Sequence, residues 1–333
     1  MNQPVLSDAQ PVPRRTSAWR PDAVTGLLVL AVSLLLLRPV LANHLDGPAV
    51  QAWATVFVSI SLQATPFLVL GVLVSGAITA FVPASAFTRL LPHNQALAVP
   101  VAGVAGVLLP GCECGSVPVA GGLMDRGVPP AAALTFLLSA PAINPIVLVA
   151  TAVAFPGRPE FVLARFVASL LAAVVVGWLW VRFGQQRWIS RRPAPHHEGD
   201  SRWEVFQGTA KHDFLHAGGF LVLGGMLAAT LNVLVPRDLY TSVASDPVLS
   251  VLALAALAVV LAICSEADAF VAASLSEFSG TALLAFMVVG PMVDVKLVAL
   301  QSGSFGRAFA IRFAPVTLVV CVASSVLVGA WLL

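Results

Sequence analysis

The sequence carries little charge for its length. Of its 333 residues, 18 are lysine or arginine and 16 are aspartate or glutamate, so charged residues make up only 10% of the chain. Hydrophobic residues make up 58%, and the mean hydropathy is +0.92. A soluble domain of this size would need far more charge on its surface. Repeated uncharged runs of membrane-spanning length instead predict an all-α, polytopic helical membrane protein.

Several function classes lack their usual signals. A net charge of +2 is too small to indicate a nucleic-acid partner. No Gly-x-x-x-x-Gly-Lys-Ser/Thr phosphate loop is present, so an ATP-driven mechanism would need a separate subunit. No nucleophile, base and orienting residue suggest a catalytic triad. We therefore expect neither an enzyme nor a bound cofactor.

Cysteine is also scarce, with four residues at positions 112, 114, 264 and 321. Cys112 and Cys114 are too close in the sequence for an unstrained mutual disulfide, and no cysteine lies in an obvious extracytoplasmic loop. We therefore interpret all four residues as thiols.

About nine hydrophobic segments follow one another along the chain. They cover residues 23–42, 50–82, 95–125, 130–155, 161–183, 214–235, 248–275, 280–300 and 308–332. Three arginines before the first segment predict a cytoplasmic N-terminus, so residues 1–49 should form a cytoplasmic tail and the first transmembrane helix. The short run 23–37 could alternatively be a signal-peptide core, but no convincing cleavage site follows it.

A linker with five basic residues, 185–213, separates two apolar parts, 50–184 and 214–333, and should be cytoplasmic. The two parts share features in the same order. The pentapeptide Phe-Leu-Val-Leu-Gly at 67–71 recurs at 220–224. The further matches are Cys112 with Cys264, Leu123 with Leu275, Phe136 with Phe286, Pro141 with Pro291, and Asn144 with Asp294. We therefore predict two transmembrane repeats.

These repeats should have opposite orientations in the membrane. As one helix, residues 95–125 would span about 46 Å, much more than a bilayer core requires. If this segment and 130–155 both crossed the membrane, the basic linker would lie outside, against the charge rule. If one of the two is instead re-entrant, the linker returns to the cytoplasm. The repeats are then inverted, as in transporters whose broken helices meet near the midplane.

Broken or re-entrant helices are expected where proline and glycine interrupt the apolar runs. At membrane depth, irregular backbone persists only where protein or water surrounds it, so such breaks indicate a pathway or a binding site. The expected break positions are Pro110, Gly111, Gly115, Pro118, Pro141, Pro145 and Pro291.

Residues 110–118 concentrate two thiols, a carboxylate and a hydroxyl between uncharged apolar stretches. Thiolates select soft ions, and a pair of them needs a third ligand for most metals. Cys112, Cys114 and Cys264 are therefore a candidate metal-binding set, although buried cysteines can also be small apolar fillers. The candidate substrate-binding residues are these three cysteines together with Ser139, Asn144, Ser265 and Asp294.

Five ionisable residues lie within the hydrophobic segments: Glu113, Glu266, Asp268, Asp294 and Lys296. Burial favours the neutral form of a carboxyl group, which suits proton coupling. We assign proton or charge coupling to Glu113, Glu266 and Asp268, while Asp294 and Lys296 could neutralise one another. Asp268 and Lys296 could alternatively lie in the headgroup region.

Two histidines, His212 and His216, stand one helical turn apart with Asp213 between them, which is similar to a zincin motif with aspartate in place of glutamate. Because they begin a membrane segment directly after the linker, we interpret them as interfacial polar residues rather than as a metal site.

The chain resembles the predicted permeases that include the ArsP organoarsenical efflux proteins and the YraQ-type membrane proteins. The resemblance covers roughly residues 50–333 and rests on Cys-Glu-Cys-Gly-Ser-Val-Pro at 112–118, Arg-Gly-Val-Pro at 126–129 and the run at 136–145, with counterparts at 263–268 and 290–291. It implies a multi-helix permease, and some family members export trivalent methylated or aromatic arsenicals. Asn144 and Pro145 depart from the arsenical exporters.

The leading hypothesis is a multi-pass permease of the cell inner membrane with a cytoplasmic N-terminus. It would move a soft metal or metalloid species, such as a trivalent organoarsenical, through a thiol-containing site between the repeats. Its expected partners are the lipid bilayer, a small inorganic or organometalloid substrate and a second membrane or soluble subunit. The alternatives are a non-transporting subunit that anchors or regulates a partner, and a membrane thiol redox protein.

Overall fold

The computed structural model describes residues 47–83, 92, 94–109, 113–190, 201–234 and 246–333. Pro48–Leu333 forms one unit, and Met1–Gly47 is assigned to another. The predicted N-terminal tail and first helix lie outside the described residues, as do Pro110, Gly111 and Cys112.

All regular secondary structure in the described part of the chain is helical, so the predicted all-α membrane class is confirmed. Six helices or consecutive helix pairs are long and apolar enough to span a bilayer. They are α3 (Pro48–Phe81), α7 (Pro130–Ile143) with α8 (Pro145–Ala154), α9 (Pro159–Phe183), α10 (Arg202–Leu234), α14 (Gly280–Met292) with α15 (Val295–Phe305), and α16 (Arg307–Leu332).

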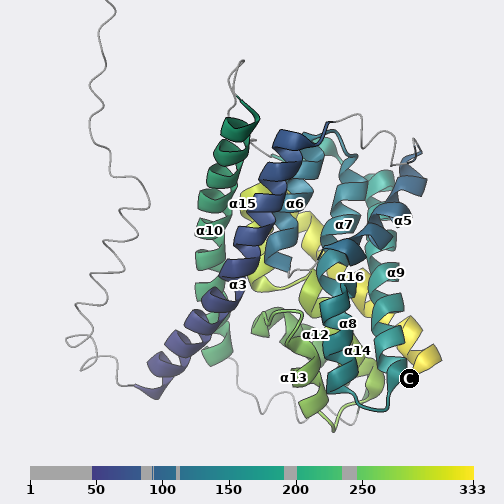
Figure 1. Cartoon of the computed structure of the whole chain (residues 1–333). Helices are drawn as coiled ribbons and strands as arrows, with labels where there is room; N and C mark the ends of the chain where they lie inside the picture. Colours follow the sequence, from purple (N-terminus) through teal and green to yellow (C-terminus); the bar gives the residue numbers. More distant parts are fainter. Residues whose placement is uncertain (1–46, 84–91, 93, 110–112, 191–200, 235–245) are drawn as a thin grey trace, which may run out of the picture. The chain divides into compact units, whose positions relative to one another are not determined.

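Shorter helices complete the described fold. They are α5 (Gln95–Ala105) with the 3₁₀ turn η1 (Gly106–Leu108), α6 (Glu113–Asp125), the 3₁₀ turn η2 (Gln186–Trp188), α12 (Pro247–Leu261) and α13 (Asp268–Ser274). In Figure 1, α5 and α6 lie in the upper half of the bundle, and α12 and α13 lie in the lower half. Likewise α7 lies above α8, whereas α14 lies below α15. The long helices α3 and α10 pack against each other along one flank.

Two of the helix interruptions have the same construction. Asn144 ends α7 with extended backbone (φ −68°, ψ 157°), and its Oδ1 accepts a hydrogen bond from the Val147 amide at 3.0 Å. Asp294 separates α14 from α15 with extended backbone (φ −136°, ψ 167°), and its Oδ1 accepts a hydrogen bond from the Leu297 amide. Each side chain therefore satisfies an amide that the first turn of the next helix would leave unpaired.

Four of the predicted break positions lie inside helices and correct the sequence expectation. Gly115 and Pro118 belong to α6, Pro141 to α7 and Pro291 to α14. A proline removes a single backbone hydrogen bond, and neighbouring helices can compensate for that loss in a membrane bundle. Pro145 instead occupies the first position of α8, where its missing amide hydrogen costs nothing.

Gly115 serves close packing rather than a break. A Cβ atom built on it would lie 2.7 Å from the Phe67 carbonyl oxygen, and one built on Gly71 would collide with the Gly115 backbone. The backbones of α3 and α6 therefore touch at a point where only glycine fits.

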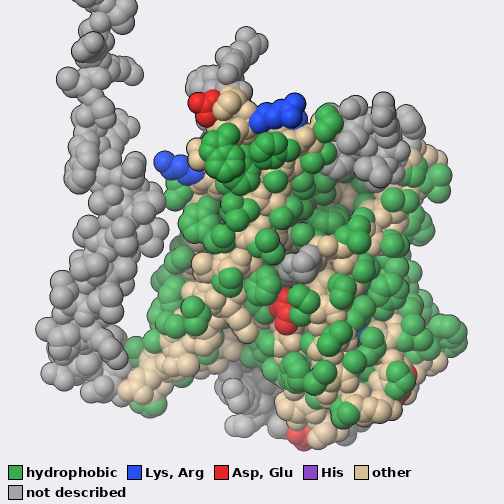
Figure 2. All heavy atoms as spheres, in the orientation of Figure 1, with side chains coloured by type: hydrophobic (Ala, Val, Ile, Leu, Met, Phe, Trp, Pro, Cys, Tyr) green, Lys and Arg blue, Asp and Glu red, His purple; other side chains and the backbone are tan. Residues whose placement is uncertain are grey.

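The core of the bundle is centred on α14, in which every residue from Ala282 to Met292 is buried. The outer helices expose apolar side chains, for example Leu62 on α3 and Val319 on α16. Figure 2 shows hydrophobic side chains over much of one face, with Lys and Arg near its upper edge. A helix that is apolar on its outer face suits contact with lipid, so this distribution fits a membrane-embedded bundle.

Candidate functional site

A buried lysine lies at the centre of the candidate site. The Lys296 Nζ atom lies 2.6 Å from Glu113 Oε1 and 3.8 Å from Asp294 Oδ2, and all three side chains are fully buried. The same ammonium donates a hydrogen bond to the Ala262 carbonyl at 3.2 Å. Since an unpaired buried charge is very costly, these contacts are what allow Lys296 to remain in the interior.

The backbone of Ala262 is shaped for this contact. Ala262 follows α12 and adopts a left-handed conformation (φ 50°, ψ 42°), the only positive φ of a non-glycine residue in the described part of the chain. A Cβ atom makes this conformation unfavourable, so the surrounding contacts must hold it. The bend ends α12 and begins the turn that leads to α13.

A second buried ion pair joins α9 to α13. The Arg165 Nη2 atom lies 2.7 Å from Asp268 Oδ2 and also donates a hydrogen bond to the Ser265 carbonyl at 3.2 Å. Arg165 Nη1 donates to Thr151 Oγ1 at 2.9 Å. Arg165 thereby fixes the start of α13 to the other half of the chain.

Both ion pairs connect residues from different halves of the sequence. Glu113 is the first residue of α6, and its partner Lys296 is in the first turn of α15. Asp268 is the first residue of α13, and its partner Arg165 is on α9. The N-terminal ends of short helices therefore supply the carboxylates, a position that the helix dipole favours for negative charge.

The six residues Glu113, Arg165, Glu266, Asp268, Asp294 and Lys296 are called the charge cluster below. Glu266 belongs to it because it interacts electrostatically with Glu113, Lys296 and Arg165. The cluster contains four carboxyl groups but only two cationic side chains. One oxygen of each carboxyl group accepts no hydrogen bond from the described residues, and neither does the buried Ser265 hydroxyl. A proton, a water molecule or a cationic ligand could therefore bind to these acceptor atoms.

Two thiols adjoin the charge cluster. Cys114 and Cys264 are buried, and both interact electrostatically with the Lys296 ammonium. The Cys114 Sγ atom also lies 3.9 Å from Glu113 Oε1. Cys112, the third member of the predicted metal-binding set, lies outside the described residues. Among the described residues, no group of three or more His, Cys, Asp or Glu side chains could hold a metal ion.

The remaining predicted site residues make local hydrogen bonds. Asn144 and Asp294 act as helix caps, and Asn144 also donates from Nδ2 to the Ala140 carbonyl at 3.1 Å. Ser139 donates to the Phe136 carbonyl at 3.3 Å and packs against Gly106. Substrate contact by these residues remains a prediction.

Arg165 was missed by the sequence interpretation, although a signal was present. It is a cation within the apolar segment 161–183, and intramembrane charges are functional candidates by default. Asp268 and Lys296, for which a headgroup location was left open, are buried in the protein interior. Lys296 also lies closer to Glu113 than to Asp294, the partner expected from the sequence.

Two cavities are lined by elements that lead to the Glu113–Lys296 pair. The smaller, of about 240 Å³, is lined by His212, Asp213 and His216 of α10 and by Gly303 and Ser304 near the end of α15. The larger, of about 590 Å³, is lined by the end of α12 and by Ile263, which follows Ala262. The smaller cavity therefore lies toward the end of the helix that begins near Lys296, and the larger one is lined by the residue that follows Ala262.

His212 and His216 line the smaller cavity, and among the described residues they belong to no group of three potential metal ligands. The rings of His212 and His216 are stacked with their centroids 6.0 Å apart. Asp213 also lines this cavity, and its Oδ2 accepts a hydrogen bond from Ser75 Oγ at 2.9 Å.

Comparison with known proteins identifies relatives along most of the chain. A family model described as "Predicted permease" matches residues 50–330. The chain is 35% identical over 281 residues to the "UPF0718 protein YcgR" of Bacillus subtilis (strain 168), which covers 82% of this chain and 96% of that protein. It is 32% identical over 295 residues, or 86% of this chain and 98% of the relative, to a "Putative two-component membrane permease complex subunit" of Streptococcus mutans serotype c (strain ATCC 700610 / UA159). No solved structure matches the chain.

Proposed function

Because this chain belongs to the predicted permease family, which matches it over residues 50–330, we propose that its substrate passes between the two halves at the charge cluster. The observation that carries this proposal is the pair of buried ion pairs that join the halves, Glu113 with Lys296 and Arg165 with Asp268. Intramembrane charges of this kind typically mark substrate or ion pathways. The two cavities near this pair would supply space for a substrate to approach it.

The transported species is a soft metal or metalloid, with trivalent organoarsenicals among the candidates. Cys114 and Cys264 come from different halves: the Cys114 Sγ atom lies 3.9 Å from the Glu113 oxygen that pairs with Lys296, and Cys264 is two residues from Ala262, whose carbonyl accepts a hydrogen bond from Lys296. Thiolates bind soft ions, and Lys296 supplies the counter-charge that a thiolate at either position would need. Cys112, two residues before Cys114, would be the third ligand.

The carboxyl groups of the charge cluster, which outnumber its cationic side chains, would couple transport to the movement of protons or charge. Glu113, Glu266 and Asp268 each have an oxygen without a hydrogen bond from the described residues, so each can accept a proton or a cation. Movement of charge through the site would then be balanced by protonation of these groups.

The two halves, 50–184 and 214–333, act as inverted repeats around this site, with the linker 185–213 and the N-terminus in the cytoplasm of the cell inner membrane. The opposite placement of α5–α6 and α12–α13 in Figure 1 supports this arrangement. The matched caps Asn144 and Asp294 support it as well, since each interrupts the corresponding helix pair of its half. Segment 95–125 is then the re-entrant one.

The test is flux into liposomes that contain the purified protein, measured for a panel of soft metals and organometalloids. The Cys114→Ser and Cys264→Ser variants should lose at least 10-fold in rate for the species that the wild-type protein moves. Cys321→Ser is the matched control, because Cys321 is equally buried but contacts Met292 rather than the charge cluster. The thiol site would be refuted if neither substitution changed the flux of any transported species.

A second candidate role is that of one subunit in a two-part permease. The naming of the Streptococcus mutans relative as a complex subunit favours it. Purified chain alone in liposomes decides between the two roles. Flux without any other protein supports a self-sufficient permease, whereas flux that requires a co-purifying membrane protein supports the subunit role.

A further inference from the structure

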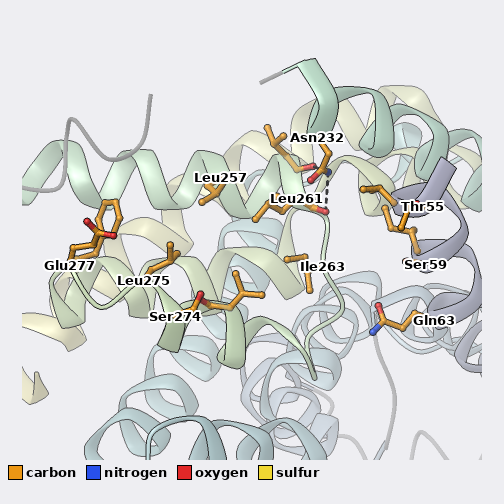
Figure 3. Close-up of a pocket in the computed structure, with 15 residues that line it drawn as sticks. Thr55, Ser59, Gln63, Asn232, Leu257, Leu261, Ile263, Ser274, Leu275 and Glu277 are labelled. Atoms are coloured by element: carbon orange, nitrogen blue, oxygen red, sulfur yellow. Dashed lines mark hydrogen bonds between the residues drawn. The ribbon is translucent and has the colours of Figure 1, made fainter. Parts of the chain in front are cut away.

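The larger cavity is an elongated cleft, called the α3–α13 cleft below. Figure 3 shows α12 along one side of it and α13 along the other. Thr55, Ser59 and Gln63 of α3 lie toward one end, and Glu277 lies at the opposite end of the view. The apolar lining includes Val56, Ile60, Leu257, Val260, Leu261, Ile263, Val271, Leu275 and Phe278.

Three of the five α3 residues that line the cleft are polar, although α3 is an apolar membrane helix. Thr55, Ser59 and Gln63 are spaced four residues apart, so they share one face of the helix, and all three are exposed. Acyl chains cannot form hydrogen bonds, and a polar stripe facing them would be unfavourable. The stripe therefore suits an occupant with polar groups better than lipid tails.

The parts of the cleft formed by α12 and α13 are mainly apolar, and the charge in the described lining is negative. Leu257 and Leu261 of α12 lie across the cleft from Leu275, and Val271 of α13 also lines it. Among the described residues that line it, Glu277 is the only charged one. A volume of about 590 Å³ lies in the range of sites for organic small molecules, and a bare inorganic ion would fill little of it.

We propose that the α3–α13 cleft binds an amphipathic organic cation, with its apolar body between α12 and α13 and its positive charge toward Glu277. Negative charge at Glu277 excludes anions, and the surplus of carboxyl groups in the charge cluster has the same preference. The inner edge of the cleft reaches the cluster, since Ile263 lies between Ala262, which accepts a hydrogen bond from Lys296, and Cys264.

The place of this cleft on the transport path rests on the proposed function, but ligand binding in the cleft does not. A thiophilic species with an apolar organic group and a positive charge would satisfy both the cleft and the charge cluster. The cleft would then select the organic part, and Cys114 with Cys264 would select the soft atom.

The binding test uses two ions of nearly the same shape and opposite charge, tetraphenylphosphonium and tetraphenylborate. Binding to the full-length protein in lipid nanodiscs is measured by equilibrium dialysis, with empty nanodiscs subtracted. The wild-type protein should bind the phosphonium at least 10-fold more tightly than the borate. Glu277→Gln should reduce this preference at least 5-fold, and Ser59→Leu, which fills the cleft, should weaken phosphonium binding at least 10-fold.

Two control variants keep the test specific. Glu160→Gln removes an exposed carboxylate outside the cleft lining, and Thr65→Leu makes a similar polar-to-apolar change on α3 outside the cleft lining. Both should bind the phosphonium as the wild-type protein does. Equal binding of the two ions, or phosphonium binding that is insensitive to both Glu277→Gln and Ser59→Leu, would overturn the proposal.

The binding result is separable from the transport result. Cys114→Ser should lose flux but retain phosphonium binding, because the thiol does not line the cleft. Normal flux together with absent phosphonium binding would overturn the cleft proposal while leaving the proposed function intact.

Discussion

At the scale of single residues, the molecule places charges where membrane proteins rarely have them. Lys296 and Arg165 are fully buried, and each is held by a carboxylate from the other half of the chain. Replacing a buried ion pair by apolar residues is often neutral or stabilising, so stability alone does not explain such pairs. Their presence is best explained by a function that needs charge at this depth.

Paired substitutions separate stability from function at the Glu113–Lys296 contact. Glu113→Gln leaves the Lys296 ammonium with weakened pairing and should destabilise the protein by about 3–5 kcal/mol, the usual effect of breaking a buried pair. The double variant Glu113→Gln with Lys296→Met removes both charges and should recover most of that loss. The measurement is thermal unfolding in detergent, followed by tryptophan fluorescence.

Transport should respond differently from stability. The double variant should remain inactive in liposomes despite its recovered melting temperature, because the charges themselves are gone. A double variant that is both stable and fully active would show that the pair is only structural.

The sequence indicated most of the charged residues within the apolar segments, but it did not indicate which of them form ion pairs. Glu113 and Lys296 stand out because each interrupts an apolar run. This local signal favoured a functional interior for Glu113 and left a headgroup location open for Lys296. Their contact joins positions 183 residues apart, which no local pattern specifies. Arg165 was overlooked, yet its contacts position Ser265 and Asp268.

At the scale of elements, the helices depend on a few close contacts and caps. The α3 and α6 backbones touch at Gly71 and Gly115, where a Cβ atom would meet the facing backbone. The first turns of α8 and α15 depend on the side chains of Asn144 and Asp294. Prolines inside α6, α7 and α14 were expected to end these helices, but packing in the bundle keeps them helical.

Alanine substitutions of two helical glycines should have opposite effects. Gly71→Ala should destabilise the protein by about 1–3 kcal/mol, because the added methyl group forces α3 away from α6. Gly208→Ala on α10 has open space around it and should stabilise by about 0.5–1 kcal/mol through better helix propensity. Thermal unfolding of the two variants under identical conditions provides the comparison, and a lower melting temperature for Gly208→Ala than for Gly71→Ala would contradict this packing.

At the scale of the whole molecule, the structural class was predictable from the sequence. The arrangement of the helices was predictable only in part. Hydropathy and low charge were sufficient to predict a polytopic helical protein, because a bilayer requires long apolar helices. Pro145 stands at an observed interruption, whereas Gly115, Pro118, Pro141 and Pro291 lie inside helices, because proline or glycine marks a weak point and packing decides whether the helix ends there. Neither cavity could be predicted, since their walls combine α3 or α10 with elements far along the chain.

The central claim is that both halves contribute to one substrate site, and thiol footprinting tests it most directly. Wild-type protein in liposomes is alkylated with N-ethylmaleimide, with and without a species shown to be transported, and the modification of each cysteine is measured by mass spectrometry. One shared site predicts that Cys114 and Cys264 are protected together, with the same dependence on substrate concentration, while Cys321 is unaffected. Protection of neither thiol, or of only one, at concentrations that saturate transport would contradict a site shared between the halves.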